Sequence, residues 1–282
     1  VSTGTGTALV NLTAGINVPV AGCEVTWTLY PADALESSDI SYTISGYTDP
    51  QNASAYLELP LGVYYVSVSV GGNCYGDNDE SGVLTVAPLT LNPGEGTIGG
   101  GWYQATQNPR INFGYVVQIT QQKTDKVTGV KTTVYRGELL MSSKSKWRVK
   151  AHIKSTVIQN SSGVVTSGTP AWGTSSCPSG VYVTGASPKC GSFIGSGMLQ
   201  KWVSSSGGSA NNGRWVDFKP ISFTTTVYDG GWLKTCKNKT CQTTDLSDYF
   251  GIKMVPSDGS MLPSDVPSTI PIQIKQGQIR IF

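Results

Sequence analysis

The amino-acid sequence has little of the chemistry on which most enzymes depend. His152 is the only histidine among the 282 residues, so Ser/His/Asp and Cys/His catalysis both lack a suitable base. Glu138 is the only glutamate after Glu95, which leaves the carboxylate pair of a glycosidase to be assembled from turn-like aspartates. No G-x-G-x-x-G segment lies between a strand pattern and a helix pattern. We therefore expect a protein that is not an enzyme and binds no cofactor.

Long apolar runs and helix-forming residues are also scarce. No run of about 18 apolar residues predicts a transmembrane segment. Charged residues make up only 13% of the chain, Gly accounts for 34 residues, and Ser and Thr are abundant, a composition typical of all-β secreted proteins. Because the chain begins at Val1 rather than at Met, we expect a mature product located extracellularly or at the cell surface.

Basic residues are missing from the first third of the chain. Residues 1–100 contain ten Asp and Glu and no Lys or Arg, whereas the remainder contains eight acids and all twenty bases. The formal charges are therefore −10 and +12, which together give the net charge of +2. Such a division favours either an anionic partner for the basic part or head-to-tail contact between copies.

The six cysteines predict disulfides. None has the CxxC spacing of a zinc site, and the single histidine has no second histidine as a partner ligand. Disulfides persist outside the cytosol, which again indicates an extracellular protein. Many connectivities are possible; we expect the local pairs Cys23 with Cys74, Cys177 with Cys190, and Cys236 with Cys241.

A small β-sandwich is predicted for residues 1–92. Short alternating runs such as CEVTWTLYPA and GVYYVSVSVGG are separated by Gly, Pro, Asn and Asp at intervals of about ten residues. Further positions form a family pattern, namely Pro19, Val20, Ala21, Gly22, Thr48, Asp49, Tyr56, Leu57, Leu59, Pro60, Gly62, Tyr64 and Val66. With them the segment resembles the prealbumin-like, carboxypeptidase-regulatory or Cna-B type of surface domain, which implies an Ig-like sandwich.

The resemblance to Cna-B domains has one departure. Many of those domains are joined by a Lys–Asn isopeptide bond, but no lysine precedes Lys123 in this chain. Such a bond is therefore excluded within the first domain, and we expect the disulfide between Cys23 and Cys74 to replace it.

Two segments near the end of the acidic part have their own interpretations. GDNDESG, with Asp77, Asp79 and Glu80, offers clustered carboxylates that suit Ca²⁺, although it lacks EF-hand spacing and also fits a solvated turn. Residues 93–101 combine Pro93 with five glycines and are predicted to be a hinge or a close-packed linker.

A second, basic β-sandwich is predicted for residues 102–282. The positions that carry a resemblance are Gly101, Trp102, Asn112, Phe113, Gly114, Gly137, Leu139, the strand 149–157, FTTTVYDGG at 223–231, Phe250, Gly251 and Ile252. They resemble a β-domain that follows choice-of-anchor regions in bacterial secreted proteins, a family that implies no chemistry. GTSSCPSG…KCGS and KTCKNKTC are interpreted as disulfide-stapled hairpin insertions.

The segment KSKWRVKAHIK is the most unusual strand pattern in the chain. As a β-strand it places Trp147, Val149, Ala151 and Ile153 on one face, because side chains alternate with period two. The opposite face carries Lys144, Lys146, Arg148, Lys150, His152 and Lys154. This face is either solvated or neutralised by a neighbouring strand, or it is a contact surface for an acidic partner, for which the chain's own acidic part is a candidate.

The basic part also suits other anionic partners to different degrees. Nucleic acid is disfavoured, since Trp147 points away from the cationic face and a secreted disulfide protein rarely meets it. Anionic surface polysaccharide is a better ligand, and Trp202, Trp215 and Trp232 are candidates for a sugar-stacking platform, although tryptophans in β-sandwiches more often belong to the core.

The C-terminal segment STIPIQIKQGQIRIF is predicted to be a strand. Ile270, Ile272 and Ile274 share one face, and Ile279 and Ile281 continue the alternation after Gly277, which suits a bulge or bend. Such a strand either closes the sheet of its own domain or adds to an open sheet edge of the next subunit.

Taken as a sequence, the chain favours an all-β protein of two β-sandwich domains in tandem, stapled by disulfides. We expect a non-enzymatic structural protein that assembles into a surface filament or layer, with head-to-tail contacts between the acidic and the basic domain. The alternative is an adhesin or binding module that recognises glycan.

Overall fold

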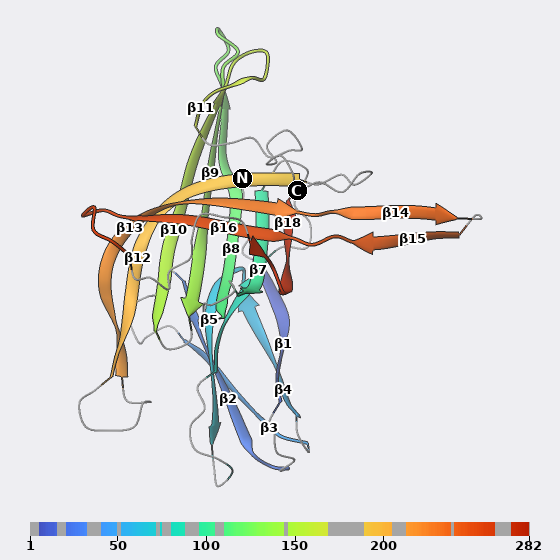
Figure 1. Cartoon of the computed structure of the whole chain (residues 1–282), viewed down its shortest axis with the longest axis vertical. Helices are drawn as coiled ribbons and strands as arrows, with labels where there is room; N and C mark the ends of the chain where they lie inside the picture. The colour runs from blue at the N-terminus through green and yellow to red at the C-terminus, as the bar shows by residue number, and fades with distance from the viewer. Residues whose placement is uncertain are drawn as a thin grey trace.

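The computed structural model contains strands and no helix among the residues that it describes (Figure 1). These residues are 6–15, 21–32, 41–49, 52–71, 74, 80–87, 96–104, 110–143, 146–168, 189–204, 213–237, 240–262 and 272–281. Within them, the side chains of 80–81, 165–168, 204, 213, 232–237 and 240–245 are not described. The predicted all-β class is confirmed.

Two small sheets form the acidic part, which we call the N-terminal sandwich. One pairs β1 (Thr7–Gly15) with β4 (Asn52–Pro60), and the other has the order β3 (Tyr42–Tyr47), β2 (Glu24–Pro31), β5 (Gly62–Gly71) and β6 (Glu80–Val86). Trp27, Leu29 and Leu59 lie fully buried in their common core. In β2 every second residue faces this core, as the alternating sequence predicts.

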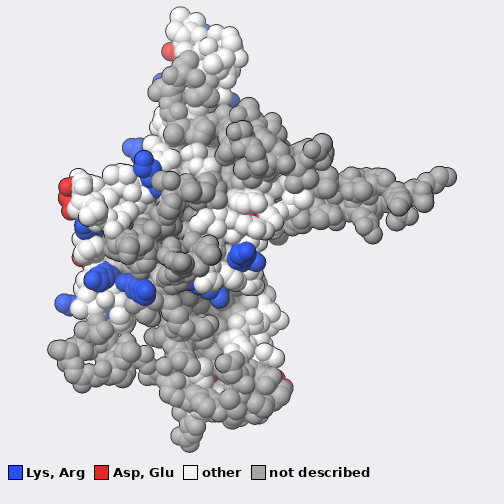
Figure 2. Space-filling view, in the orientation of Figure 1, with Lys and Arg blue, Asp and Glu red and all other residues white. Residues whose placement is uncertain are grey.

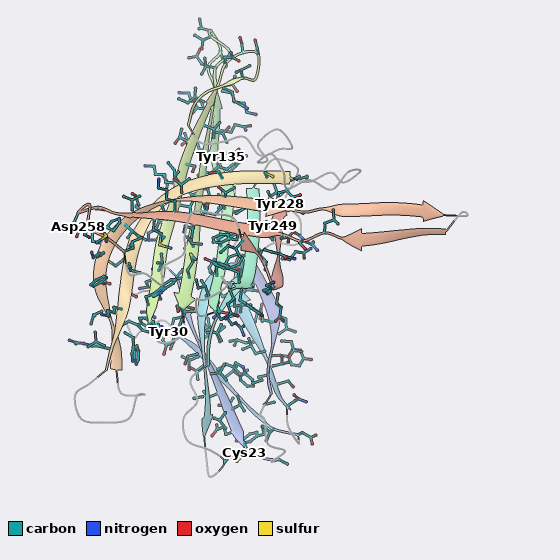
Figure 3. All side chains as sticks on the ribbon, viewed as in Figure 1. Cys23, Tyr30, Tyr135, Tyr228, Tyr249 and Asp258 are labelled. Carbon is teal, nitrogen blue, oxygen red and sulfur yellow. A yellow bond between two sulfur atoms is a disulfide. The ribbon has the colours of Figure 1, made fainter. Side chains whose placement is uncertain are left out.

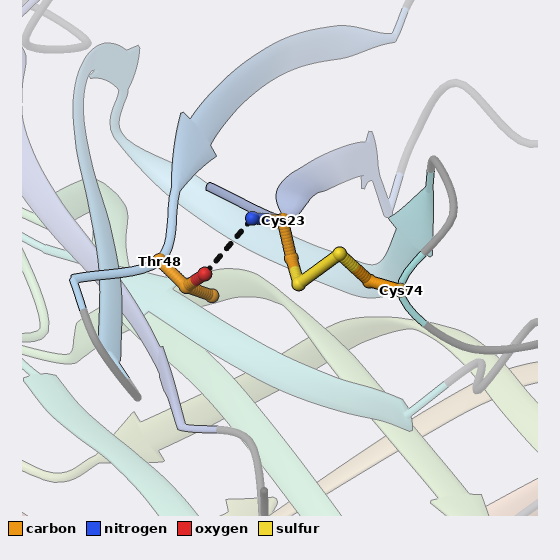
Figure 4. Close-up of a disulfide and its surroundings, with 3 residues drawn as sticks. All are labelled: Cys23, Thr48 and Cys74. Atoms are coloured by element: carbon orange, nitrogen blue, oxygen red, sulfur yellow. Dashed lines mark hydrogen bonds between the residues drawn. A yellow bond between two sulfur atoms is a disulfide. The ribbon is translucent and has the colours of Figure 1, made fainter. Parts of the chain in front are cut away.

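A disulfide fastens the far end of the N-terminal sandwich. Cys23 and Cys74 are bonded, with their Cα atoms 5.7 Å apart, so this predicted pair is confirmed. The Cys23 N–H donates to Oγ1 of buried Thr48 at 3.0 Å (Figure 4). The Thr48 N–H in turn donates to the Cys23 carbonyl at 3.0 Å. The bridge therefore joins the start of β2 to the segment that follows β5, and the two hydrogen bonds hold the end of β3 beside it.

Ten of the described strands from β7 onward form one large sheet, which we call the curled sheet. Its order is β17-β16-β13-β12-β10-β9-β8-β7-β18, and β11 pairs with the end of β10. The strands are β7 (Gly96–Tyr103), β8 (Ile111–Thr124), β9 (Lys131–Ser143), β10 (Trp147–Gln159), β11 (Val165–Gly168), β12 (Lys189–Ser204), β13 (Gly213–Asp229), β16 (Tyr249–Pro256), β17 (Ile272–Gln273) and β18 (Gln276–Ile281).

The curled sheet is strongly curved and therefore has a concave inner face. Phe113 of β8 stacks on Phe250 of β16 with ring centroids 4.2 Å apart, although the two strands are not neighbours. Tyr115 of β8 similarly meets Phe193 of β12 at 5.0 Å. The apolar face is therefore buried against itself, so the basic part is a half-barrel where the sequence predicted a second sandwich of two facing sheets.

The C-terminal strand closes the sheet of its own chain. β17 pairs with β16 and β18 pairs with β7, so one short segment connects both edges of the curled sheet. Ile279 and Ile281 point into the core, and Gly277 adopts a φ of 118° at the predicted bend. Of the two alternatives predicted for the C-terminal segment, the structure shows the one in which it pairs within its own domain.

Two aspartates hold the outer side of β18. The Ile279 N–H donates to Oδ2 of Asp248 at 2.6 Å, and the Ile281 N–H donates to Oδ2 of Asp229 at 3.1 Å. Oδ1 of the same carboxylates accepts from the Gly230 and Gly231 N–H groups. Carboxylates thus satisfy backbone donors that a further strand would otherwise have bonded.

The predicted linker is a strand instead. Residues 96–101 lie in β7 between β8 and β18, and residues 93–95 lie outside the described part. A Cβ atom on Gly99 would come within 2.5 Å of the Tyr115 ring, and one on Gly100 within 3.2 Å of the Thr85 hydroxyl. Close packing, rather than flexibility, explains these glycines.

The N-terminal sandwich packs directly on the outside of the curled sheet. Val63 of β5 forms a buried cluster with Val116 of β8, Leu140 of β9 and Ala32. The Thr85 hydroxyl of β6 donates to the Gly99 carbonyl of β7 at 3.2 Å. The described contact between the acidic and the basic part is therefore mainly apolar.

Two strands leave the body as a hairpin arm. β14 (Trp232–Lys237) and β15 (Thr240–Asp245) pair only with each other and extend to one side in Figure 1. Near the arm's base, the rings of Tyr228 and Tyr249 meet edge to face at 5.5 Å (Figure 3). The Leu246 N–H closes the base by donating to the Gly231 carbonyl at 3.0 Å.

Candidate functional site

Strand β10 has the predicted alternation, but its cationic face is not a continuous surface. Trp147, Val149, Ala151 and Ile153 are buried in the core of the curled sheet. On the other face Lys146, His152 and Lys154 are exposed, whereas Arg148 is half-buried and Lys150 is only 4% exposed. Lys144 lies outside the described residues. Lys150 is covered because its cross-strand partner Leu140 packs against the N-terminal sandwich.

Arg148 is committed to contacts inside the molecule. Its guanidinium lies over the rings of Trp215 and Tyr65, at 4.8 and 5.4 Å from their centroids. Its Nε donates to Oε1 of Gln200 at 2.5 Å, and Gln200 Nε2 donates to Oδ1 of Asp217 at 2.7 Å. Burial lowers the pKa of Arg148 to about 10, against the smaller opposing effects of Tyr65, Tyr30 and Asp217. Arg148 and Lys150, the two central residues of the predicted contact surface, are therefore turned toward other parts of the same molecule.

Two of the three candidate stacking tryptophans come together. Trp202 and Trp215 are cross-strand partners in β12 and β13, with centroids 5.2 Å apart and nearly perpendicular rings. Trp215 also contacts Tyr65 and Arg148, so its faces are largely occupied. Trp232 lies beyond the opposite end of β13, and its side chain is not described. The structure does not assemble a platform of three tryptophans.

The opposite face at the ends of β12 and β13 carries an exposed cluster that the sequence analysis missed. We call it the basic tip, and it consists of Lys201, Val203, Arg214 and Phe218. Val203 is the cross-strand partner of Arg214, and the Lys201 ammonium lies 5.8 Å from the Phe218 ring centroid. Phe218 is 44% exposed and Val203 45%. Figure 2 shows Lys and Arg side chains near the ends of these strands.

A matching acidic cluster lies beside the disulfide of the N-terminal sandwich. We call it the acidic tip, and it consists of Glu24, Tyr47 and Asp49. Glu24 is the cross-strand partner of Tyr47, all three side chains are exposed, and Tyr47 is 66% exposed. The Cys23–Cys74 bridge and the buried Thr48 fix the backbone here. Each tip therefore combines charge of one sign with an exposed aromatic ring.

A groove of about 640 Å³ runs between β6 and the outer face of β7 and β18. In register, Trp102, Gly100 and Ile98 of β7 lie opposite Gln276, Gln278 and Arg280 of β18. Arg110 lies over the Trp102 ring at 4.7 Å, and its Nε donates to Asn112 Oδ1 at 3.2 Å. From the sequence Trp102 and Asn112 stand out only as family positions, because their grouping with β18 depends on the pairing of strands that are distant in the chain.

Metal-ligating side chains are not clustered among the described residues. These contain no cluster of three His, Cys, Asp or Glu side chains that could hold a metal ion. The calcium candidates fall outside them, since Asp77 and Asp79 are not described and Glu80 is described only as backbone in β6. In the same described part no helix is long and apolar enough to cross a membrane.

The other predicted disulfides are tested only in part. Cys190 is disulfide-bonded and fully buried, while its expected partner Cys177 lies outside the described residues. Cys236 and Cys241 are direct cross-strand partners in the hairpin arm. This register agrees with their expected pairing, which stays a prediction.

No protein-family model, curated protein or solved structure matches the chain. The two family resemblances drawn from the sequence therefore stay predictions.

Proposed function

We propose that the protein is a non-enzymatic, extracellular structural subunit that associates head to tail with further copies of itself. The acidic tip of one copy contacts the basic tip of the next. The observation that supports this most is that both tips are exposed while the contact between the acidic and the basic part within one chain is mainly apolar. The opposite charges are thus left available for another molecule.

The two tips have the composition of a small protein interface. Phe218 and Val203 offer an apolar centre beside Lys201 and Arg214, and Tyr47 offers an aromatic ring beside its two acids. Aromatic residues in the centre with charges around them are typical of specific interfaces, and complementary potentials direct the encounter.

Contact between unlike surfaces determines the kind of assembly. The acidic and the basic tip belong to different sheets, so their contact is heterologous rather than symmetric. Heterologous contacts that do not close on themselves produce open filaments. We therefore propose a surface filament or layer as the assembled form.

The test is to measure assembly by light scattering and negative-stain microscopy at low and high salt. The double variant Lys201→Glu/Arg214→Glu should remain monomeric, because both side chains are exposed and their charges are reversed. Lys123→Glu/Lys126→Glu is the matched control, since these lysines are exposed at the β8–β9 turn. A wild-type protein that stays monomeric at every concentration and salt level would overturn the proposal.

The rival function is glycan binding through the tryptophan pair. Trp202 is half-buried and so retains some exposed ring surface, as sugar stacking requires. Affinity electrophoresis in anionic polysaccharide separates the two functions. Retardation that is lost in Trp202→Ala but kept in the Lys201→Glu/Arg214→Glu variant would favour the adhesin.

A further inference from the structure

The groove beside β6 has the features of a peptide-binding site. β6 is the last strand of its four-stranded sheet and pairs only with β5. Among the described residues, its other edge has no backbone partner. An unpaired strand edge offers main-chain donors and acceptors to an added strand, which is a common mode of peptide recognition.

Glycines give the groove a flat floor. Gly100 of β7 and Gly277 of β18 line it, together with Gly99 and Gly101. A Cβ atom on Gly100 would come within 3.2 Å of the Thr85 hydroxyl of β6, and one on Gly101 or Gly277 would meet the backbone of the paired strand. The glycines therefore let β6, β7 and β18 lie close together and leave no side chain of their own on the floor of the groove.

The charge of the groove is positive. Arg110 and Arg280 are the only charged residues that line it in the described part of the chain, and both are exposed. The Arg110 guanidinium lies at the level of Trp102, and Arg280 is opposite Ile98. Ile98 and Trp102 are four positions apart in β7, which corresponds to roughly 13 Å at the usual rise per residue of a strand.

A sugar is a poor fit for the same groove. One face of Trp102 is covered by Arg110, and its indole N–H donates to Oε1 of Gln276 at 3.1 Å. The ring therefore offers at most one open face and no free donor to a stacked saccharide. An extended peptide needs neither, because its main chain supplies the contacts.

We propose that the groove binds an extended acidic peptide segment of a partner protein as an added strand along β6. Two carboxylates of the peptide, four residues apart and hence on the same face of the strand, pair with Arg110 and Arg280. This site is separate from the acidic and basic tips, and it does not depend on self-assembly.

The probe is a phage library of random 12-residue peptides, selected on the wild-type protein. We expect enrichment of extended sequences with Asp or Glu at positions i and i+4. The most enriched peptide is then synthesised together with its Gln counterpart and a version methylated at alternate backbone nitrogens. Binding of the parent peptide should be at least ten-fold tighter than that of either derivative.

Variants of the protein locate the site. Arg110→Glu/Arg280→Glu should weaken the parent peptide at least ten-fold, and Gln278→Trp should do the same by filling the groove from an exposed position. The control Lys123→Glu/Lys126→Glu should bind as the wild type does, and circular dichroism should show that all variants are folded.

Three results would overturn the proposal. One is that no acidic peptide is enriched on the wild-type protein. Another is that the enriched peptide binds the Arg110→Glu/Arg280→Glu and Gln278→Trp variants unchanged. The third is that polygalacturonate, and no peptide, binds in a manner that requires both arginines, which would make the groove a site for acidic glycan.

Discussion

The N-terminal sandwich and the curled sheet bury their apolar faces in different ways. The sandwich places two small sheets face to face and fastens one end with the Cys23–Cys74 bridge. The curled sheet bends until Phe113 and Phe250 of the same sheet stack on each other. A small core gains from a covalent link that restricts the unfolded chain, whereas long strands supply enough apolar surface to close on themselves.

The two parts also use charge differently. Lys and Arg occur only in the basic part, and two of them, Arg148 and Lys150, are drawn into the region under the sandwich. Acidic side chains such as Glu24 and Asp49 stay exposed at the far end of the sandwich. The described contact between the two parts is mainly apolar, whereas the Glu24 and Asp49 side chains are exposed.

Removing β18 should have the largest effect on the stability of the curled sheet. A chain that ends at Lys275 exposes the edge of β7 and loses Ile279 and Ile281 from the core of the curled sheet. We expect it to unfold or to be poorly secreted, as judged by yield and circular dichroism. A folded monomer of normal stability would show that the curled sheet does not need its closing strand.

Phe250→Ala should destabilise the curled sheet by about 3–5 kcal/mol, since it removes a fully buried ring and leaves a cavity. Urea unfolding followed by tryptophan fluorescence measures the change. Val255→Ala is the control, because Val255 lies on the same strand but is 45% exposed. Equal losses for the two variants would contradict the stacked core.

Breaking the bridge with Cys23→Ala/Cys74→Ala should lower stability by about 2–4 kcal/mol, because a long loop is no longer closed in the unfolded chain. The loss should be confined to the sandwich. Hydrogen exchange should therefore become faster in β2 and β5 and stay unchanged in β12 and β13. Faster exchange in both parts would show that the sandwich and the curled sheet unfold as one unit.

Alkaline pH should act mainly on the curled sheet. Burial raises the pKa of Tyr103 and Tyr115 well above their ordinary value of 10.0. Their neutral form therefore stabilises the fold fully below pH 10, and this contribution is lost as the pH rises above 10. Tyr103→Phe should move the onset of alkaline unfolding upward, whereas Tyr47→Phe, at an exposed site, should not. Spectrophotometric titration combined with circular dichroism distinguishes the two.

Local patterns of the sequence predicted local features well. The alternation around Trp147 and Val149, the buried faces of Ile279 and Ile281, and the pairing of Cys23 with Cys74 all follow from period-two patterning or short-range reasoning, and the structure confirms them.

Features that depend on distant contacts could not be predicted. Lys150 and Lys154 have the same place in the strand pattern, yet Lys150 is buried and Lys154 is exposed. The difference arises from the packing of Val63 on Leu140. The glycines of β7 have a linker's composition, yet they are required by packing against other strands, as Gly99 is against the ring of Tyr115. The basic tip was missed because Lys201 and Arg214 become neighbours only through the pairing of β12 with β13.

The most direct test of head-to-tail contact is a reciprocal charge exchange, measured by light scattering at low salt. Lys201→Glu/Arg214→Glu and Glu24→Lys/Asp49→Lys should each be monomeric alone, because each presents like charges to itself. An equimolar mixture of the two should form open assemblies in which the variants alternate, because both tips of one are acidic and both tips of the other are basic. A single chain with all four changes should assemble as the wild type does. Mixtures and four-fold variants that stay monomeric, or single-tip variants that still assemble, would contradict the proposed contact.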